Sequence, residues 1–302
     1  MAHIILFENI NFHGAHRHVV HDEPNLNASD DNFFNDRVSS LAVLEGNWAC
    51  YPDANFRGKP YPNILGPGLY PNVTAVKIKN DDMSSLLPVA TAPNVHGDPF
   101  DNHILLFENA NYHGAHKHVF TREPNLNASD DNFFNDRVSS LAIFQGNWRF
   151  YANSGFAKPP YPPVLGPVTD SVTGQRSPGG YPFVPNVGIK NDDMSSLEPV
   201  ADRPTVRNPE RLQEGVILFE NANFHGAHKH VLKGEPNLNA PDDNFFNDKV
   251  SSLAILSGQW EFWSDANFKP DNRGVVLNKN IYSFVGDVGI KNDDISSLRP
   301  LV

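Results

Sequence analysis

Residues 5–44 read ILFENINFHGAHRHVVHDEPNLNASDDNFFNDRVSSLAVL, and the organisation of the whole chain follows from this stretch. The same sequence returns nearly unchanged from Leu105 and again from Ile217. A repeat of this length predicts serial structural units that each build a core. Pro-bearing stretches at 90–102 and 201–215 separate the copies and are typical of linkers. We therefore expect three domains, at residues 3–89, 103–200 and 216–302.

A shorter string, N-D-x-x-S-S, occurs twice in each copy and divides each domain into two halves. It lies at 35–40 and 80–85, at 135–140 and 191–196, and at 247–252 and 292–297. The two strings start 45 residues apart in the first and last copies and 56 apart in the middle copy. We place the extra residues in the Pro-, Gly- and Ser-rich loop at 166–182.

Short apolar or alternating runs at 4–7, 41–44, 48–51 and 73–78 predict strands, with turn residues between them. Helical periodicity is missing, and the 25 prolines would interrupt long helices. The pattern predicts an all-β chain of antiparallel sandwiches. We expect backbone at positive φ in a folded hairpin at three glycines, Gly14, Gly114 and Gly226.

Composition narrows the classes of function. With 24 basic against 35 acidic residues, the net charge of −11 argues against nucleic acid and points to cations as partners. No apolar run is long enough to span a bilayer, so we expect no membrane insertion. No leader is visible, which leaves a cytoplasmic protein or a secreted one whose leader has been removed. The single cysteine, Cys50, takes the position of Phe150 and Phe262 in the other copies and is expected in the core.

The repeated string carries the chemistry. An N-D-x-x-S-S loop offers an amide, a carboxylate, backbone carbonyls and a hydroxyl, all of them hard oxygen donors of the kind that Ca²⁺ binds in numbers of six to eight. One loop cannot fill that shell, whereas two facing loops could. For an isolated copy, a turn capped without metal would be the better interpretation. Six paired copies favour calcium.

The residues also resemble a known family. The pattern aromatic-x-x-x-x-aromatic-x-Gly at 7–14, followed by N-D-x-x-S-S and a tryptophan (Trp48, Trp148 or Trp260) at the start of each second half, is similar to the Greek-key motif of microbial βγ-crystallins. The resemblance covers nearly the whole chain. It implies three β-sandwich domains of two Greek keys each, with two calcium ions between the paired loops of each domain.

The resemblance implies the ligands of each ion. One ion per domain takes a carboxylate from the second loop, a carbonyl and a hydroxyl from the first, and a hairpin carbonyl: Asp81, Arg37, Ser39 and Glu8; Asp192, Arg137, Ser139 and Glu108; Asp293, Lys249, Ser251 and Glu220. Its twin takes a carboxylate from the first loop, with the other donors from the second half: Asp36, Asp82, Ser84 and Pro52; Asp136, Asp193, Ser195 and Ala152; Asp248, Asp294, Ser296 and Ser264. The leading Asn would hold each loop through side-chain to backbone hydrogen bonds.

Two second halves depart from the pattern. Gly58 closes the hairpin in the first domain, whereas the corresponding positions hold Lys158 and Pro270. We expect a distorted or lengthened hairpin there, which weakens the expectation for the carbonyls of Ala152 and Ser264.

The string H-G-A-H-x-H occurs once per copy and offers a second kind of site. Strand residues two apart share a face, so each copy could present two imidazoles to Zn²⁺, Ni²⁺ or Cu²⁺. The competing interpretation is a solvated strand face. The paired residues are His16 and His18, His116 and His118, and His228 and His230.

Three functions remain open at this point. The first is a calcium-binding structural or stress protein stabilised by its ions, and the second is a calcium-dependent adhesion or carbohydrate-binding array. The third is a histidine-based transition-metal protein. Nothing resembles a catalytic triad, a phosphate loop or a paired acid site, so we expect no enzyme.

Overall fold

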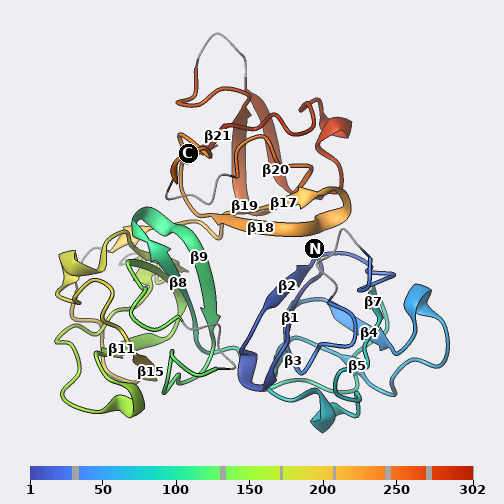
Figure 1. Cartoon of the computed structure of the whole chain (residues 1–302), viewed down its shortest axis with the longest axis horizontal. Coiled ribbons are helices and arrows are strands. Elements are labelled where there is room, and N and C mark those ends of the chain that lie inside the picture. The colour runs from blue at the N-terminus through green and yellow to red at the C-terminus, as the bar shows by residue number, and fades with distance from the viewer. Residues whose placement is uncertain are drawn as a thin grey trace.

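The apolar runs of the sequence form short strands whose inward faces build three separate cores. The computed structural model describes residues 1–28, 34–129, 134–170, 173–206, 209–241, 246–269 and 274–301. Every pair of named strands is antiparallel, and the helical segments described are short 3-10 turns. The chain is all-β, as predicted, and forms three sandwiches that we call units 1, 2 and 3 (Figure 1).

Unit 1 contains two sheets that exchange strands between its halves. The first has the order β2-β1-β3-β6 and the second β5-β4-β7. Their bounds are β1 His3–Phe7, β2 His16–Val19, β3 Ser40–Glu45, β4 Asn47–Tyr51, β5 Ile64–Leu65, β6 Gly68–Tyr70 and β7 Ser85–Val89. β6 belongs to the second half but completes the sheet of the first half, while Glu23 of the first half bridges to Leu86 in β7. The exchange interlocks the two halves and holds their loops side by side.

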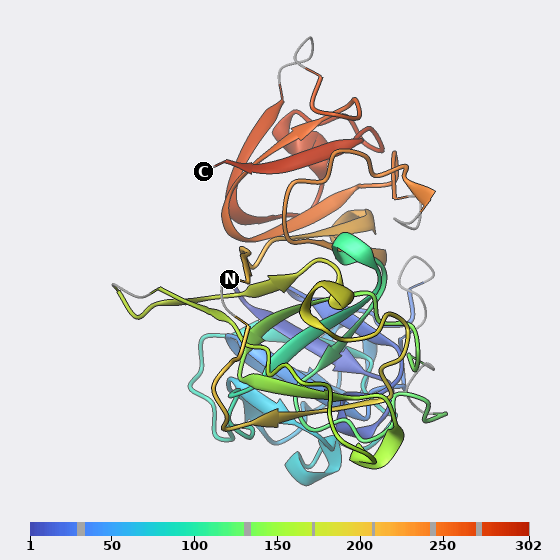
Figure 2. The ribbon, with the colours of Figure 1, turned by 90° about the vertical axis from the view of Figure 1, so that its left-hand side faces the viewer.

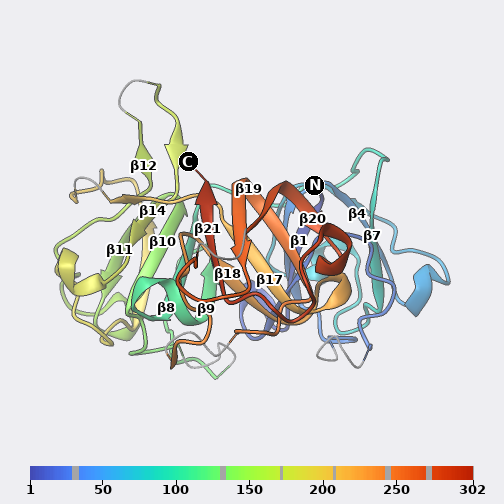
Figure 3. The ribbon, with the colours of Figure 1, turned by 90° about the horizontal axis from the view of Figure 1, so that it is seen from above.

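Unit 2 repeats this plan and adds a hairpin. Its larger sheet has the order β16-β14-β10-β8-β9, and β11 pairs with β15. The bounds are β8 His103–Asn109, β9 His113–Val119, β10 Ser140–Gln145, β11 Asn147–Tyr151, β14 Gly179–Tyr181, β15 Ser196–Val200 and β16 Glu210–Arg211. The extra residues form the hairpin of β12 (Val168–Thr169) and β13 (Arg176–Ser177), which projects from the unit in Figure 3. The expected position of the insertion is confirmed.

Unit 3 joins its two sheets through one long strand. β19 runs through the position at which β3 and β4 of unit 1 are separated, with a register shift between Ile255 and Gln259. The bounds are β17 Val216–Asn221, β18 His225–Val231, β19 Ser252–Trp263, β20 Val275–Tyr282 and β21 Ser297–Leu301. β16 lies in the second Pro-bearing connection and pairs with β14, so this segment is packed onto unit 2.

Short 3-10 turns fold each hairpin back on its sheet. In the first halves these are η1 (Ile10–Phe12), η4 (Ala110–Tyr112) and η7 (Ala222–Phe224), and in two second halves η2 (Ala54–Phe56) and η5 (Ser154–Phe156). The expected positive φ is confirmed at Gly14, Gly114 and Gly226, with values of 80°, 79° and 78°.

One predicted strand is wrong. Residues 73–78 were expected to be extended, but Val73–Val76 forms the 3-10 turn η3, and η6 (Val184–Val187) and η9 (Val285–Val288) are its counterparts. The Asn72 side chain accepts a hydrogen bond from the amide of Thr74 at 2.9 Å, which starts the turn. Lys77 ends the turn in the left-handed conformation at φ 61°. The counterparts η6 and η9 form without a side-chain cap. All three turns end in a left-handed residue and donate the amide of their first valine to the carbonyl of a first-loop serine, and these shared backbone constraints outweigh the apolar pattern.

Each unit has its own apolar core around one tryptophan. Trp48, Trp148 and Trp260 are fully buried, and each indole donates to a backbone carbonyl three residues earlier. Cys50 is also fully buried, and burial raises the pKa of its thiol to about 12. The thiol is therefore a core group, as expected from its counterparts.

The three units surround a common centre with pseudo-threefold symmetry. β2, β9 and β18 face this centre (Figure 1), and unit 3 lies against both other units in the side view (Figure 2). The residue two positions after the last histidine of each H-G-A-H-x-H string packs into an apolar cluster of a neighbouring unit. Phe120 packs onto unit 1, Leu232 onto unit 2 and Val20 onto unit 3. The contacts run in one direction around the centre and close on themselves.

Candidate metal centres

The six N-D-x-x-S-S loops share one backbone conformation. The aspartate at the second position is left-handed in all six, with φ between 50° and 53°, at Asp36, Asp81, Asp136, Asp192, Asp248 and Asp293. Aspartate tolerates this region better than most residues because its short side chain bonds locally. In five loops the preceding Asn donates to that Asp carboxylate at 2.6–2.7 Å. The expected bonds from these Asn side chains to the backbone are therefore wrong, because the side chains donate to the neighbouring carboxylate instead.

The two loops of each unit meet, as a calcium shell shared between them requires. In every unit the serine hydroxyl of the first loop donates to the aspartate of the second: Ser39 to Asp81 at 3.2 Å, Ser139 to Asp192 at 3.2 Å and Ser251 to Asp293 at 3.1 Å. In unit 1 an open depression lies over this contact, lined by Glu8, Asn9, Ile10, Asp36, Arg37, Ser39, Asn80 and Asp81. Four of the residues predicted to hold the first ion of unit 1 are thus neighbours around one hollow.

The groups assigned to the second ion of each unit are arranged less uniformly. In unit 3 the Ser296 hydroxyl lies 3.5 Å from the Asp248 carboxylate, and in unit 2 the Ser195 hydroxyl donates to the Ala152 carbonyl at 3.1 Å. The aspartate at the third position of each second loop forms an ion pair through its side chain. Lysine ammonium groups contact Asp82, Asp193 and Asp294 at 2.6, 2.8 and 3.0 Å. The backbone carbonyls of these aspartates are the donors that the resemblance assigned to the second ion.

The carboxylate of Asp36, which is assigned to the second ion of unit 1, lies close to other acidic groups. The pKa of Asp36 lies above its ordinary value because the carboxylate is partly desolvated and faces the charge of Asp82, with Lys79 offsetting part of the effect. A bound cation would reverse this repulsion.

The Glu8 carboxylate pairs with the Arg37 guanidinium, and Glu108 with Arg137. Those side chains are neutralised, so the backbone carbonyls of Glu8 and Glu108 are the donors left for an ion.

The second-half hairpin of unit 2 keeps its shape without glycine. Lys158 adopts φ 67°, close to the 72° of Gly58, and the 3-10 turn is retained. The expected distortion at Lys158 is therefore wrong: the lysine takes the strained conformation and the Ala152 carbonyl stays near Ser195. In unit 3, Asn267 and Phe268 have the φ values of the same turn, 64° and 52°. Pro270 lies outside the described residues.

The histidine strings meet at the centre of the molecule instead of facing water. The Nε2 atoms of His16 and His116 are 3.0 Å apart, and the Nε2 atom of His228 lies 3.2 Å from each. We call these three residues the histidine tripod. Since each comes from a different unit, the expected pairing of histidines within one strand describes only part of the arrangement. The competing expectation of a solvated strand face is wrong.

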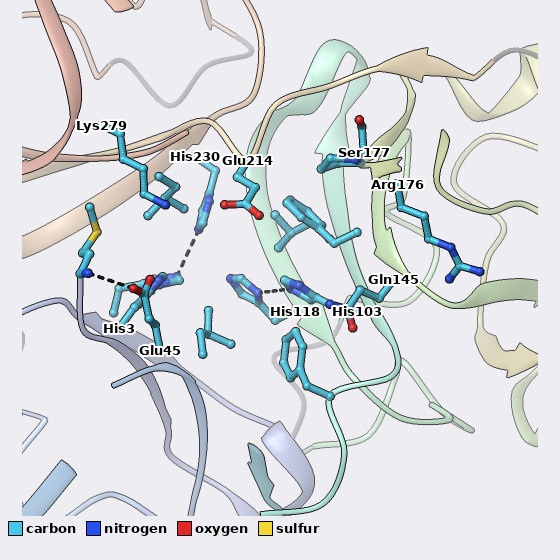
Figure 4. Close-up of a pocket in the computed structure, with 18 of the residues that line it drawn as sticks. His3, Glu45, His103, His118, Gln145, Arg176, Ser177, Glu214, His230 and Lys279 are labelled. Carbon is cyan, nitrogen blue, oxygen red and sulfur yellow. Dashed lines mark hydrogen bonds and ion pairs between the residues drawn. The ribbon is translucent and has the colours of Figure 1, made fainter. Parts of the chain in front are cut away.

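A second layer of histidines lies beside the tripod and is nearly inaccessible to solvent. His18, His118 and His230 are 1%, 2% and 5% exposed, and the Nε2 atoms of His18 and His230 are 3.2 Å apart. His3 contacts Nδ1 of His18 at 2.8 Å and His103 contacts Nδ1 of His118 at 2.9 Å. Figure 4 shows His3 of unit 1, His103 and His118 of unit 2 and His230 of unit 3 side by side at the centre.

Burial keeps these imidazoles neutral. It lowers the pKa of His3 to about 4, of His103 to about 3 and of His228 to about 4, with charges of neighbouring groups adding to the effect. The pKa values of the other tripod and second-layer histidines also lie well below the ordinary value, chiefly because of burial. Neutral imidazole is the form that binds metal.

The first histidine of each string has another role. His13 contacts Glu123 at 2.8 Å, His113 contacts Glu235 at 2.7 Å, and His225 contacts Glu23 at 3.1 Å. Each pair joins two units, and together the pairs run once around the centre. Burial raises the pKa of each glutamate, but the histidine hydrogen bond and nearby cationic groups outweigh it, so each pKa lies below its ordinary value. The sequence alone gave no partner for these three histidines.

Comparison with known proteins identifies the family. The model of the Beta/Gamma crystallin family matches residues 3–89 and 215–301, more than half of the chain. The chain belongs to the βγ-crystallin family, as the aromatic-glycine pattern indicated. Within the described part of the chain, no helix has the length and apolar character needed to cross a membrane.

The relatives share the domain but differ in length. Human "Beta/gamma crystallin domain-containing protein 2" is 26% identical over 269 residues, which cover 88% of this chain and 14% of the relative. Rat "Beta-crystallin B1" is 31% identical over 155 residues, 51% of this chain and 56% of the relative. The chain thus spans a small part of the first and about half of the second. A solved "transition-metal-ion-binding betagamma-crystallin from Methanosaeta thermophila" is 30% identical, with 28% of this chain and 99% of that chain covered and a TM-score of 0.25.

Proposed function

We propose that this chain is a calcium-binding structural protein of the stress-related kind, which holds up to six Ca²⁺ ions and is stabilised by them. The observation that carries the proposal is the contact between paired loops, in which Ser39, Ser139 and Ser251 each meet the aspartate of the facing loop at 3.1–3.2 Å. A hydroxyl and a carboxylate held this close, together with the backbone carbonyls of the proposed ligand set, are a suitable start for a calcium shell.

The charge of the chain agrees with cation loading. Six Ca²⁺ ions bring twelve positive charges to a chain whose net charge is −11. Each site has a single formal carboxylate among its assigned protein ligands, so we expect moderate affinity. At a calcium concentration of 100 times Kd, each site would add about 2.7 kcal/mol to the free energy of unfolding. Stabilisation, with no catalysis, is therefore the proposed consequence.

The adhesive or carbohydrate-binding alternative would need exposed aromatic side chains beside the calcium. In the described part of the chain, Phe183 and Phe284 are exposed, and each precedes a residue whose amide donates to the carbonyl of a first-loop serine, Ser139 or Ser251. The proposal of a structural role therefore rests on the paired loops and the charge of the chain. We also propose that the three domains span residues 3–89, 103–200 and 216–302.

Calcium titration by calorimetry tests the proposal. We expect about six ions per chain for the wild type. The double variant Asp36→Asn with Asp81→Asn preserves side-chain shape and removes one carboxylate from each site of unit 1, so it should lose the two ions of that unit. Asp98→Asn is the matched control, because Asp98 is an exposed carboxylate of unit 1 that lies outside the paired loops. Equal calcium binding by the double variant and the control would refute the ligand assignment.

We propose transition-metal binding as a second function. It is carried by a different observation, the convergence of six imidazoles, three buried and three half-buried, at the centre of the molecule. Imidazole nitrogen suits Zn²⁺, Ni²⁺ and Cu²⁺ and is a poor donor for Ca²⁺. The two functions therefore use separate sites and separate ions.

A further inference from the structure

The tripod has the dimensions of a metal site. Metal–nitrogen bonds of about 2.0–2.1 Å put the ligand nitrogens about 3.3 Å apart in a tetrahedron and about 2.9 Å apart on the face of an octahedron. The three Nε2···Nε2 distances, 3.0, 3.2 and 3.2 Å, lie between these values. The nitrogens of His16, His116 and His228 therefore need little movement to bind one ion on the pseudo-threefold axis.

Hydrogen bonding among the three imidazoles cannot explain the arrangement. Each Nε2 of a neutral imidazole carries either a hydrogen or a lone pair. Three mutually close nitrogens form three pairs, so at least one pair must set two hydrogens or two lone pairs against each other. A cation at the centre removes the conflict, because all three lone pairs then point at it.

The second layer supplies a fourth donor. The ligand atoms of His16, His18, His116 and His228 all lie within 4.8 Å of one another. Nε2 of His18 contacts Nε2 of His230 at 3.2 Å, and a bond to the metal would replace this contact. His3 and His103 occupy Nδ1 of His18 and His118, which directs the Nε2 atoms of the second layer inward. Such outer contacts fix the ring orientation of metal-binding histidines in general.

An ion can reach these residues. A cavity of about 570 Å³ lies between the units and is lined by His3, His18, His103, His118 and His230, together with residues of all three units (Figure 4). Exposed residues, among them Glu45, Arg176 and Lys279, also line it, so the cavity joins the second layer to the molecular surface. It reaches the second layer at His18, beside the tripod, which gives the route of entry that a buried metal centre needs.

We propose that His16, His116 and His228 bind one transition-metal ion, of the Zn²⁺, Co²⁺ or Ni²⁺ class, with His18 as the fourth donor, and that this ion fastens the three units to one another. The ligands lie 100 and 112 residues apart in the chain, and each unit contributes one arm of the tripod. An ion bound in this way closes long loops, so its binding energy stabilises the closed arrangement of the units. The inference rests on the second proposed function.

The test is zinc titration of the full chain in saturating Ca²⁺, with His116→Gln and His228→Gln as variants. We expect one Zn²⁺ per wild-type chain, and each variant should weaken Zn²⁺ affinity by about 100-fold or more, since removing a ligand costs at least as much as removing an outer contact. His96→Gln is the matched control, because His96 is exposed and lies outside the tripod and the second layer. X-ray absorption of the Co²⁺-loaded wild type should show three or four imidazole nitrogens, and this result does not depend on the folding of a variant.

The outcomes distinguish failure of the tripod assignment from failure of transition-metal binding as a whole. If Zn²⁺ binds the wild type and both variants equally, or Co²⁺ has fewer than three imidazole ligands, a metal function stands and the tripod is refuted. If neither Zn²⁺ nor Co²⁺ binds the wild type, both are refuted. Loss of binding in both variants but not in His96→Gln supports the three-unit site.

Discussion

Lys158 shows at the scale of one residue how the repeat tolerates substitution. Its φ of 67° is a conformation that costs a non-glycine residue about 1–2 kcal/mol. We therefore expect Lys158→Gly to raise the free energy of unfolding of unit 2 by about 1 kcal/mol, measured by denaturant melts. Lys59→Gly is the control, because this exposed lysine follows the hairpin glycine of unit 1 and is not left-handed. A less stable Lys158→Gly protein would show that the strain is absent.

The conformation or burial of a residue was predictable from the sequence where its near neighbours determine it. The second-position aspartates, the hairpin glycines and Cys50 lie where the sequence placed them, because turn geometry and core volume depend on near neighbours. The conformation of Lys158 was not predictable in this way. The hairpin is held by contacts such as the Ser196 hydroxyl with the amide of Phe156 at 3.2 Å, and these come from 40 residues away.

At the scale of elements, the end of each central strand holds the units together. Phe120 follows β9 and packs edge-on against Phe7 and Phe12 of unit 1, with ring centroids 6.0 and 5.3 Å apart. Leu232 and Val20 are its smaller counterparts. Truncation of Phe120 to alanine should cost about 3–5 kcal/mol at the contact between units 1 and 2.

Comparison of three variants checks this. Phe120→Ala, Leu232→Ala and Val20→Ala should loosen their contacts in decreasing order, because the buried area removed falls in that order. The radius of gyration from small-angle scattering reports the opening of neighbouring units. An equal radius of gyration in all three variants would contradict the assigned contacts.

Strands and turns show the limits of periodicity. The runs at 4–7, 41–44 and 48–51 form β1, β3 and β4 because their alternation matches one buried sheet face. The run at 73–78 looks equally apolar, but it forms η3, just as its counterparts form η6 and η9 without a side-chain cap. The amide of Val73 donates to the carbonyl of Ser39, and the hydrophobic pattern could not reveal this contact with the other half of the unit.

The whole molecule depends on pH through its centre. The pKa values of His3, about 4, and His103, about 3, lie below the ordinary 6.5, so the unfolded or opened chain binds protons more readily. Stability should be constant above about pH 6.5 and should fall as the pH drops towards 4. Glu23, Glu123 and Glu235 have lowered pKa values and act in the same direction below about pH 4.5.

Small-angle scattering across this range measures the effect. We expect the radius of gyration to rise between pH 6 and pH 4 while far-ultraviolet circular dichroism still reports folded sandwiches, because the protonated groups lie mainly between units. A constant radius of gyration, or greater stability at pH 4 than at pH 7, would contradict the neutral histidine centre.

The three-unit arrangement was the part that sequence could not supply. The repeat predicted three sandwiches and the paired loops within each, since both follow from one unit taken alone. The approach of His16, His116 and His228 depends on how complete units pack against each other. The triple H-G-A-H-x-H string contained the one available hint, because three equivalent strands on a closed pseudo-threefold arrangement must present the same residues to the axis.

The central claim is that the paired loops of each unit jointly hold calcium, and a crystal structure determined in millimolar Ca²⁺ tests it most directly. We predict an ion at Asp81, Asp192 and Asp293, bonded to each carboxylate and to the facing serine hydroxyl at about 2.3–2.6 Å. Water alone between Asp81 and Ser39, and between their counterparts in the other two units, would contradict it.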